Sequence, residues 1–281
     1  MHKAIFLCLF LIYGICAECQ SLSGFSLLSG NKLNPLIVGH RGGFDTILPE
    51  NSFALFEFTA QKACSSPVSI EFDIRESASG SLYIMHDETL DRNTSGSGKI
   101  TGLQDTYIES LFLKDRNGRL TSEKIPRFSD VLRHFQNRNV ILMLDVKGEI
   151  LPKVIEQIKS LQMEHQCILL TFTAGSCREA GRLSDNLWIS SLVRNREEWE
   201  SLSEFNIPPS RLIAYITKDT PDEVITEINK KGVLLMADMS ESIRNNSTFY
   251  EPDYYLRLPE TRKLSIIITD YPVHVNKLFC N

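Results

Sequence analysis

The sequence predicts an α/β fold, a TIM-like (β/α)8 barrel that forms a single domain. Short β-branched or aliphatic runs alternate with helical stretches along most of the chain, as expected of parallel strands covered by outer helices. The 281 residues suit one such barrel, and 42% hydrophobic residues can fill one sizeable core. Polar residues gather where several apolar runs end, which is where an α/β barrel builds its active site.

Three segments are expected along the chain: a signal peptide at 1–17, a linker at 18–35 and the barrel domain at 36–281. The leader has a short, weakly basic start and an apolar run at 4–15 that is too short to span a bilayer comfortably. We expect cleavage after Ala17 and a secreted or periplasmic location. An uncleaved anchor is one alternative, and a lipoprotein anchored at Cys16 or Cys19 is another.

Nine segments are predicted to be strands, one more than a closed eight-stranded barrel holds. They are 36–38, 69–74, 82–86, 140–146, 167–172, 187–193, 212–216, 233–237 and 265–269. We take 212–216 as the extra strand. Helices are expected at 51–63, 129–137, 151–162, 197–205 and 221–231. The polar, Gly-rich segment 88–125 is expected to wrap over the site as a long loop.

Glu71 and Asp73 are two residues apart in a predicted strand, so both side chains point to the same face. In a barrel that face is the lumen. Two carboxylates this close repel each other, and a divalent cation, which prefers oxygen ligands, removes the repulsion. The pair therefore predicts a metal site. The alternative is an outward-facing acidic pair, which the apolar neighbours disfavour.

Asp145 and Lys147 repeat this spacing at the end of the apolar run 140–144. Burying both without partners would cost free energy, so we place them at the barrel mouth. A simple structural ion pair between the two is the alternative interpretation.

His40 and His86 are the candidates for proton transfer. The alcohol that leaves a phosphodiester needs a proton and the attacking hydroxyl must lose one, and two imidazoles with pKa values near neutrality suit these roles. Each histidine closes a predicted strand beside the carboxylates. Arg41, next to His40, offers a planar set of donors to a phosphate oxygen.

These motifs resemble those of the glycerophosphodiester phosphodiesterase family. In chain order, the match consists of His40-Arg41-Gly42, Pro49-Glu50-Asn51, Glu71-Phe72-Asp73, His86-Asp87, Lys147, and Thr269-Asp270 followed by Pro272. The resemblance spans about residues 36–279. Each motif alone is a weak signal, but all of them in this order form a specific one. The family's fold is a TIM barrel and its activity depends on a metal.

The resemblance implies roles for individual residues. Glu71 and Asp73 match two metal ligands of the family, and Lys147 matches the residue that holds the substrate phosphate. The third ligand is usually a Glu two residues before that Lys, but here the position is Asp145, one methylene shorter. We therefore expect one divalent cation, Mg²⁺ or Ca²⁺, on these three carboxylates, with a shifted ion or a water completing the site.

The remaining motif residues carry over less directly. His40 and His86 match the family's general acid and base, in an order that the sequence leaves open. Glu50 matches a carboxylate that contacts metal or substrate, although it could equally complement the dipole of the following helix, with Asn51 as an ordinary N-cap. The family often carries a Trp near the end of the seventh strand. Residues 234–239 instead are LLMADM, so we expect a different wall around the substrate alcohol.

The expected function is metal-dependent hydrolysis of small-molecule glycerophosphodiesters to glycerol 3-phosphate and an alcohol. The net charge of −5 gives no basic footprint for nucleic acid. One alternative is a lysophospholipase D-type phosphodiesterase, which would contact membrane through a lysolipid substrate or a lipid anchor. The other is a secreted surface or binding protein that retains the fold without activity, supported only by Asp145. The alcohol group, the metal and the oligomeric state stay open.

Cys64 and Cys280 are predicted to form a disulfide, which export would permit. The first and last helices of a closed barrel are neighbours, and each of these cysteines follows one of them at the face opposite the active site. Cys167 begins a strand about halfway round the barrel and is poorly placed for either. Four cysteines after the linker allow three pairings, so other pairings stay open.

Overall fold

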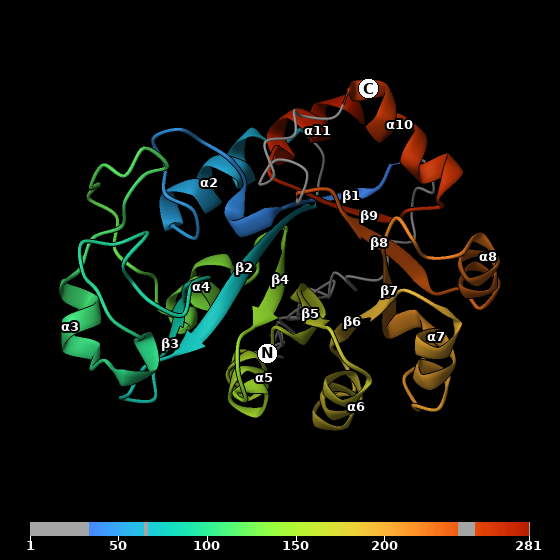
Figure 1. The fold of residues 1–281 in the computed structure, drawn as a ribbon, viewed down its shortest axis with the longest axis horizontal. Coiled ribbons are helices and arrows are strands. Elements are labelled where there is room, and N and C mark those ends of the chain that lie inside the picture. Colours follow the sequence, from blue (N-terminus) through green and yellow to red (C-terminus); the bar gives the residue numbers. More distant parts are fainter. Residues whose placement is uncertain (1–33, 65–66, 241–250, 281) are drawn as a thin grey trace, which may run out of the picture.

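The structure is a computed structural model that describes residues 34–64, 67–240 and 251–280. The expected signal peptide and most of the linker lie outside these residues. Parallel strands close into a barrel with helices around it (Figure 1). Around the ring the order is β1-β9-β8-β7-β6-β5-β4-β2, and β1 pairs with both β9 and β2 to close it. The predicted fold class is confirmed.

The elements follow the predicted βα alternation. The barrel strands are β1 (Leu36–Gly39), β2 (Val68–Glu76), β4 (Val140–Val146), β5 (Cys167–Thr171), β6 (Trp188–Val193), β7 (Leu212–Ile216), β8 (Leu234–Asp238) and β9 (Ile266–Thr269). In the described part of the chain, the helices of eight residues or more outside them are α2 (Phe53–Lys62), α4 (Phe128–Phe135), α5 (Leu151–Ser160), α6 (Ala174–Leu183), α7 (Arg196–Ser203), α8 (Asp222–Lys230) and α10 (Pro252–Thr261). The shorter α11 (Pro272–Leu278) follows β9.

The prediction of 212–216 as the extra strand was wrong. This segment is β7, which pairs in parallel with β6 and β8 inside the ring. The extra strand is β3 (Leu82–Ile84), which lies antiparallel to the last three residues of β2. At nine residues, β2 is long enough to project beyond the ring and offer this edge. His86 therefore follows an antiparallel strand, and the backbone bond from Met85 N to Asp73 O, at 2.9 Å, holds the chain beside β2.

The segment 88–125 is a packed lobe rather than a loop over the site. It contains a turn of 3-10 helix at Ile100–Gly102 and helix α3 (Asp105–Ser110), beside the barrel in Figure 1. A separate group of buried apolar side chains holds it together, including Tyr83, Met85 and Leu90. None of its described residues lines the pocket at the barrel mouth.

Alternation along the strands divides the main core into two layers. Inward-facing side chains such as Val38, Met143 and Met236 fill the lumen, while outward-facing ones pack under the helices. Toward the C-terminal ends of β2 and β4, the lumen positions become acidic, at Glu71 and Asp73 after Ser69 on β2 and at Asp145 after Met143 on β4. The strand register thus delivers the predicted site residues to one end of the barrel.

Ring closure also brings the two predicted cysteines together. Cys64 follows α2, Cys280 follows α11, and the two form a disulfide with their Cα atoms 6.2 Å apart. The predicted pairing is confirmed, and Cys167 and Cys177 are free and buried.

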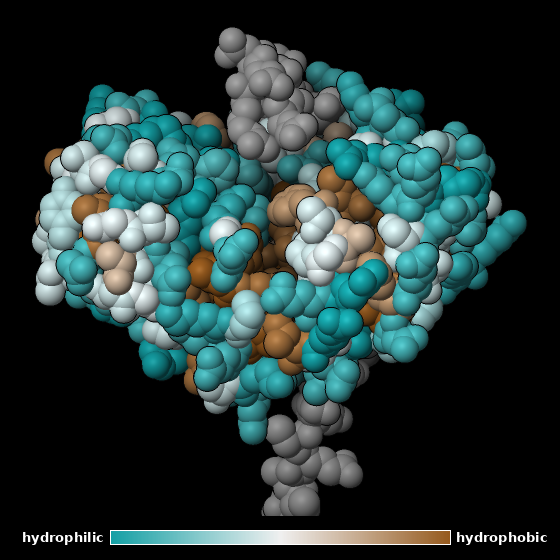
Figure 2. Space-filling view, turned by 60° about the horizontal axis from the view of Figure 1, so that its bottom comes forward, coloured by the Kyte–Doolittle hydropathy of each residue, from teal (hydrophilic) through white to brown (hydrophobic). Residues whose placement is uncertain are grey.

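The molecular surface is mixed in character. In Figure 2, which turns the lower side of Figure 1 toward the viewer, hydrophobic surface gathers in a hollow near the middle and mostly hydrophilic surface surrounds it. Within the described ranges, every helix is too short or too polar to cross a membrane.

Candidate active site

A pocket of about 160 Å³ lies at the C-terminal ends of the barrel strands. It brings together most of the predicted site residues and several others: His40, Glu71, Asp73, His86, Asp145, Lys147, Leu170, Phe172, Tyr215, Asp238 and Ile268. A larger hollow of about 430 Å³ lies on the outer surface, between α5 and the end of α6, and is lined mainly by apolar and long aliphatic side chains. The smaller pocket is therefore the candidate active site.

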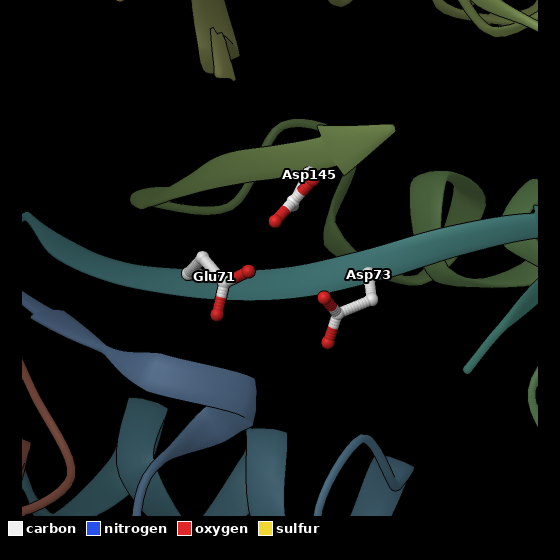
Figure 3. Close-up of side chains that lie close together, drawn as sticks. All are labelled: Glu71, Asp73 and Asp145. Carbon is white, nitrogen blue, oxygen red and sulfur yellow. The ribbon is translucent and has the colours of Figure 1, made fainter. Parts of the chain in front are cut away.

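Three carboxylates form the acidic centre of this pocket. Glu71 and Asp73 project from β2 and Asp145 from β4, and one oxygen from each lies within 4.8 Å of the others (Figure 3). The strand register places Asp73 directly beside Asp145. All three side chains are buried, as the lumen-facing prediction required.

Burial raises the pKa of two of these carboxyl groups, Glu71 and Asp145. Burial, together with the charges of Asp73 and Asp145, raises the pKa of Glu71 well above its usual range. Burial also raises the pKa of Asp145, against the opposing charge of Lys147. Three buried acids this close together are costly unless positive charge compensates them. An all-oxygen donor set of this kind fits one hard divalent cation.

Lys147 supplies positive charge at the same place. Its Nζ donates to Asp145 Oδ2 at 2.5 Å and lies 3.1 Å from Asp73 Oδ1. Burial alone would lower the pKa of Lys147, but the charges of these two carboxylates outweigh it and raise the pKa. The Asp145–Lys147 ion pair considered from the sequence is therefore present, within the acidic cluster rather than apart from it.

The turn after β1 aims a backbone amide at this cluster. Arg41 has a left-handed backbone, with φ of 52°, and its N–H donates to Glu71 Oε2 at 2.8 Å. Gly42 follows at φ of 92°, and a Cβ there would come within 2.7 Å of the Phe56 ring. Only glycine fits such a position without strain. A left-handed non-glycine residue is the kind of strain that folds retain at functional sites.

The Arg41 side chain is buried between two acids. Its Nη1 donates to Glu50 at 3.2 Å, and its Nε lies 3.8 Å from Asp73 Oδ2. Within the described part of the chain, Nε has no hydrogen-bond partner. A buried donor without a partner is costly, so this position favours an additional acceptor such as a phosphate oxygen.

Glu50 lies behind Arg41 rather than among the pocket-lining residues. It accepts from Arg41, from Arg92 Nη2 at 2.7 Å and from Asn93 Nδ2 at 2.9 Å. Burial would raise the pKa of Glu50, but the hydrogen bond from Arg92 and the charges of Arg41 and Arg92 lower it to about 2. Glu50 is thus an ionised anchor for two arginines, and its predicted contact with metal or substrate stays a prediction.

The N-cap assignment for the first helix was wrong. Ser52 caps α2, with its Oγ accepting from Leu55 N at 3.2 Å. Asn51 adopts a left-handed backbone, with φ of 57°, and its Nδ2 donates to Asp73 Oδ2 at 3.0 Å. The left-handed turn directs Asn51 into the site, so it orients a carboxylate of the acidic cluster.

Each candidate histidine is held by a carboxylate. His40 Nδ1 lies 2.6 Å from Asp270 Oδ1, and His86 Nδ1 lies 2.7 Å from Asp87 Oδ1. Asp87 is held in turn by Arg92, through Nε at 2.5 Å and Nη2 at 2.9 Å. Both rings are thereby oriented through Nδ1, so Nε2 is the nitrogen that the predicted proton transfer would use. Burial lowers the pKa of His86.

Sequence reasoning assigned no role to two of these supporting residues. Asp270 directly follows β9, and because β9 neighbours β1 in the closed ring, it meets His40. Ring closure was a signal that could have identified it. Arg92 bridges Glu50 and Asp87 from the lobe 88–125, and its position depends on a fold that local sequence does not indicate.

Comparisons with known proteins point to one family. The sequence model of the "Glycerophosphoryl diester phosphodiesterase family" matches residues 40–242. A glycerophosphodiester phosphodiesterase from Caldanaerobacter subterraneus is 26% identical over 169 residues, which cover 58% of this chain and 68% of the relative. Human glycerophosphodiester phosphodiesterase 1 is 34% identical over 131 residues, 45% of this chain and 38% of that protein.

Solved structures share the fold over most of the chain. A glycerophosphoryl diester phosphodiesterase from Parabacteroides distasonis superposes with a TM-score of 0.77 at 27% identity, covering 88% of this chain and 87% of that one. A phosphodiesterase from Oleispira antarctica, solved in complex with the product sn-glycerol-3-phosphate, superposes with a TM-score of 0.67 at 19% identity, covering 88% and 98%.

Proposed function

The chain belongs to the glycerophosphoryl diester phosphodiesterase family of phosphoric diester hydrolases, and we propose that it hydrolyses glycerophosphodiesters to glycerol 3-phosphate and an alcohol with the help of one divalent cation. One observation carries this proposal. Two carboxylate-held histidines and one lysine line the same pocket as three clustered, buried acids. That combination provides proton transfer, phosphate binding and cation binding at a single place.

The phosphate is expected to bind beside the acidic cluster. A divalent cation held by Glu71, Asp73 and Asp145 would supply positive charge to the phosphate and to an attacking oxygen. Lys147 carries the ammonium that can turn from Asp145 toward a phosphate oxygen. Arg41 adds a donor, Nε, that is unsatisfied within the described residues.

The two histidines divide the proton transfers. One removes the proton of the attacking hydroxyl, and the other protonates the alkoxide as the bond from phosphorus to the departing oxygen breaks. Asp270 and Asp87 hold the two rings through Nδ1, so each transfer would use Nε2.

We also propose that the chain works outside the cytoplasm. The Cys64–Cys280 disulfide supports this, because disulfides persist mainly in oxidising compartments. Intact-mass measurement of the protein exported by its native host tests the expected cleavage after Ala17, and an added lipid mass would favour the lipoprotein alternative.

The function is tested by following release of the free alcohol from a panel of glycerophosphodiesters and one lysolipid. The proposal expects turnover of the soluble diesters, loss of that turnover with a chelator, and recovery when Mg²⁺ or Ca²⁺ is added back. Turnover of the lysolipid alone would favour the lysophospholipase D alternative. Absence of turnover with every substrate, metal included, would overturn the proposal.

A further inference from the structure

The pocket has a second wall that the proposed chemistry does not use. Around the ring, β7 lies across from β2, and β8 lies across from β4. The wall opposite the acidic cluster therefore carries Tyr215 from β7 and Asp238 from β8. Phe172, which directly follows β5, also lines the pocket, and its ring lies near that of Tyr215. A substrate whose phosphate sits at the cluster would extend its alcohol toward this wall.

Two aromatic rings face the pocket on that wall. The rings of Phe172 and Tyr215 are 6.3 Å apart between centroids, at an interplanar angle of 64°. Phe172 is 44% exposed, although it directly follows a fully buried strand. A large apolar side chain exposed at the rim of a pocket marks a surface that a ligand can cover.

A carboxylate accompanies the two rings. Asp238 is the last residue of β8 and shares the lumen face with Leu234 and Met236. Its Oδ1 accepts from Ser240 N at 2.7 Å, which fixes the side chain at the wall. Of the described pocket-lining residues apart from the acidic cluster, Lys147 and the two histidines, Asp238 carries the negative charge, while Leu170, Phe172, Tyr215 and Ile268 are uncharged.

We propose that Phe172, Tyr215 and Asp238 form a subsite for a cationic alcohol of the choline type, which makes them specificity-determining residues for the reaction proposed above. Aromatic faces attract a quaternary ammonium, and a nearby carboxylate adds Coulomb attraction. Such an ammonium cannot donate hydrogen bonds, so aromatic faces suit it better than they suit a primary ammonium. A neutral alcohol gains nothing from the charge of Asp238. This inference rests on the proposed function.

The test compares kcat/KM for glycerophosphocholine and glycerophosphoglycerol. Wild type should prefer the choline ester, and Asp238→Asn and Phe172→Leu should each lower the ratio of the two values by roughly tenfold, the scale of one cation–π or charge contact. Asp238→Glu keeps the charge and should retain most of the preference. Asp130→Asn on α4 and Phe112→Leu in the lobe are matched controls on the exposed surface, and their ratios should equal that of wild type.

Competitive inhibition gives a second readout that does not depend on turnover of the choline ester. Choline should inhibit hydrolysis of glycerophosphoglycerol more strongly than its neutral isostere 3,3-dimethylbutanol does, and Asp238→Asn should reduce the difference. Equal ratios in wild type, Asp238→Asn and Phe172→Leu would overturn the subsite, as would a wild-type preference for glycerophosphoglycerol. Failure of the proposed function is distinct, because neither diester would then be hydrolysed.

Discussion

The Lys147 ammonium lies 2.5 Å from Oδ2 of Asp145. The residue expected to hold the substrate phosphate is therefore the direct partner of a residue expected to bind the cation. The same ammonium also lies 3.1 Å from Asp73 Oδ1. Because Lys147 and a cation would share these oxygens, binding of the cation should free Lys147 for the phosphate.

Replacing Lys147 with Gln should separate the two roles. Loss of a charge-assisted hydrogen bond should raise KM for a glycerophosphodiester by about tenfold or more. Affinity for Mg²⁺ or Ca²⁺, measured by calorimetry, should stay equal or become tighter, because a competing charge is removed. Lys153→Gln on α5, where Lys153 pairs with Glu76, is the matched control. Weaker metal binding in Lys147→Gln would contradict this assignment.

The histidines should be needed for turnover more than for binding. His40→Ala and His86→Ala should each lower kcat by roughly two or more orders of magnitude, the usual scale for losing a general acid or base. Binding of glycerol 3-phosphate should survive better, and the exposed His165→Ala serves as control. A variant that keeps near wild-type turnover of a diester with a poor leaving group would remove that histidine from proton transfer.

Glu50 should contribute stability that depends on pH. Its folded-state pKa is about 2, below the usual 4.5, so its contribution is fully present above about pH 4.5 and is lost as the pH falls toward 2. Urea unfolding at neutral pH should show Glu50→Gln less stable than wild type by on the order of 2–3 kcal/mol, and the gap should shrink below pH 4.5. The exposed Glu156→Gln should show no such gap. A gap independent of pH would mean that Glu50 acts through packing alone.

The disulfide should stabilise the closed ring. It joins positions 216 residues apart, so replacing Cys64 and Cys280 together by Ser should lower the free energy of unfolding by about 2–5 kcal/mol. Reductant should destabilise wild type to a similar extent and leave the double variant unchanged. Peptide mapping without reductant checks the pairing directly, and free thiols at both positions would refute it.

The sequence allowed the barrel and most of the site to be predicted, because strand ends and lumen-facing spacing are local properties. Strand direction is not local. The run at 82–84 looks like any barrel strand, and its antiparallel pairing outside the ring is seen only in its register with the last residues of β2. The role of Arg92 could not be predicted for the same reason, because Arg92 reaches Glu50 from a lobe whose packing depends on distant residues. Ring closure, in contrast, is a property of the fold class, and it sufficed to predict the disulfide.

The role of Asp145 distinguishes a metal site from an ion pair more directly than any other residue. If Asp145 is a metal ligand, Asp145→Asn should weaken metal affinity and activity together, and excess Mg²⁺ or Ca²⁺ should restore part of the activity. Asp145→Glu should then be tolerated or shift the metal preference. If Asp145 only pairs with Lys147, Asp145→Asn would leave metal affinity unchanged.

The decisive measurement is a calorimetric titration of Mg²⁺ and Ca²⁺ into wild type, Asp145→Asn and the surface control Asp130→Asn, with glycerophosphodiester hydrolysis assayed on the same preparations. We expect one cation per chain in wild type and in the control, and clearly weaker binding with lower, metal-rescued activity in Asp145→Asn. Equal affinities in all three proteins would contradict a cation held jointly by Glu71, Asp73 and Asp145.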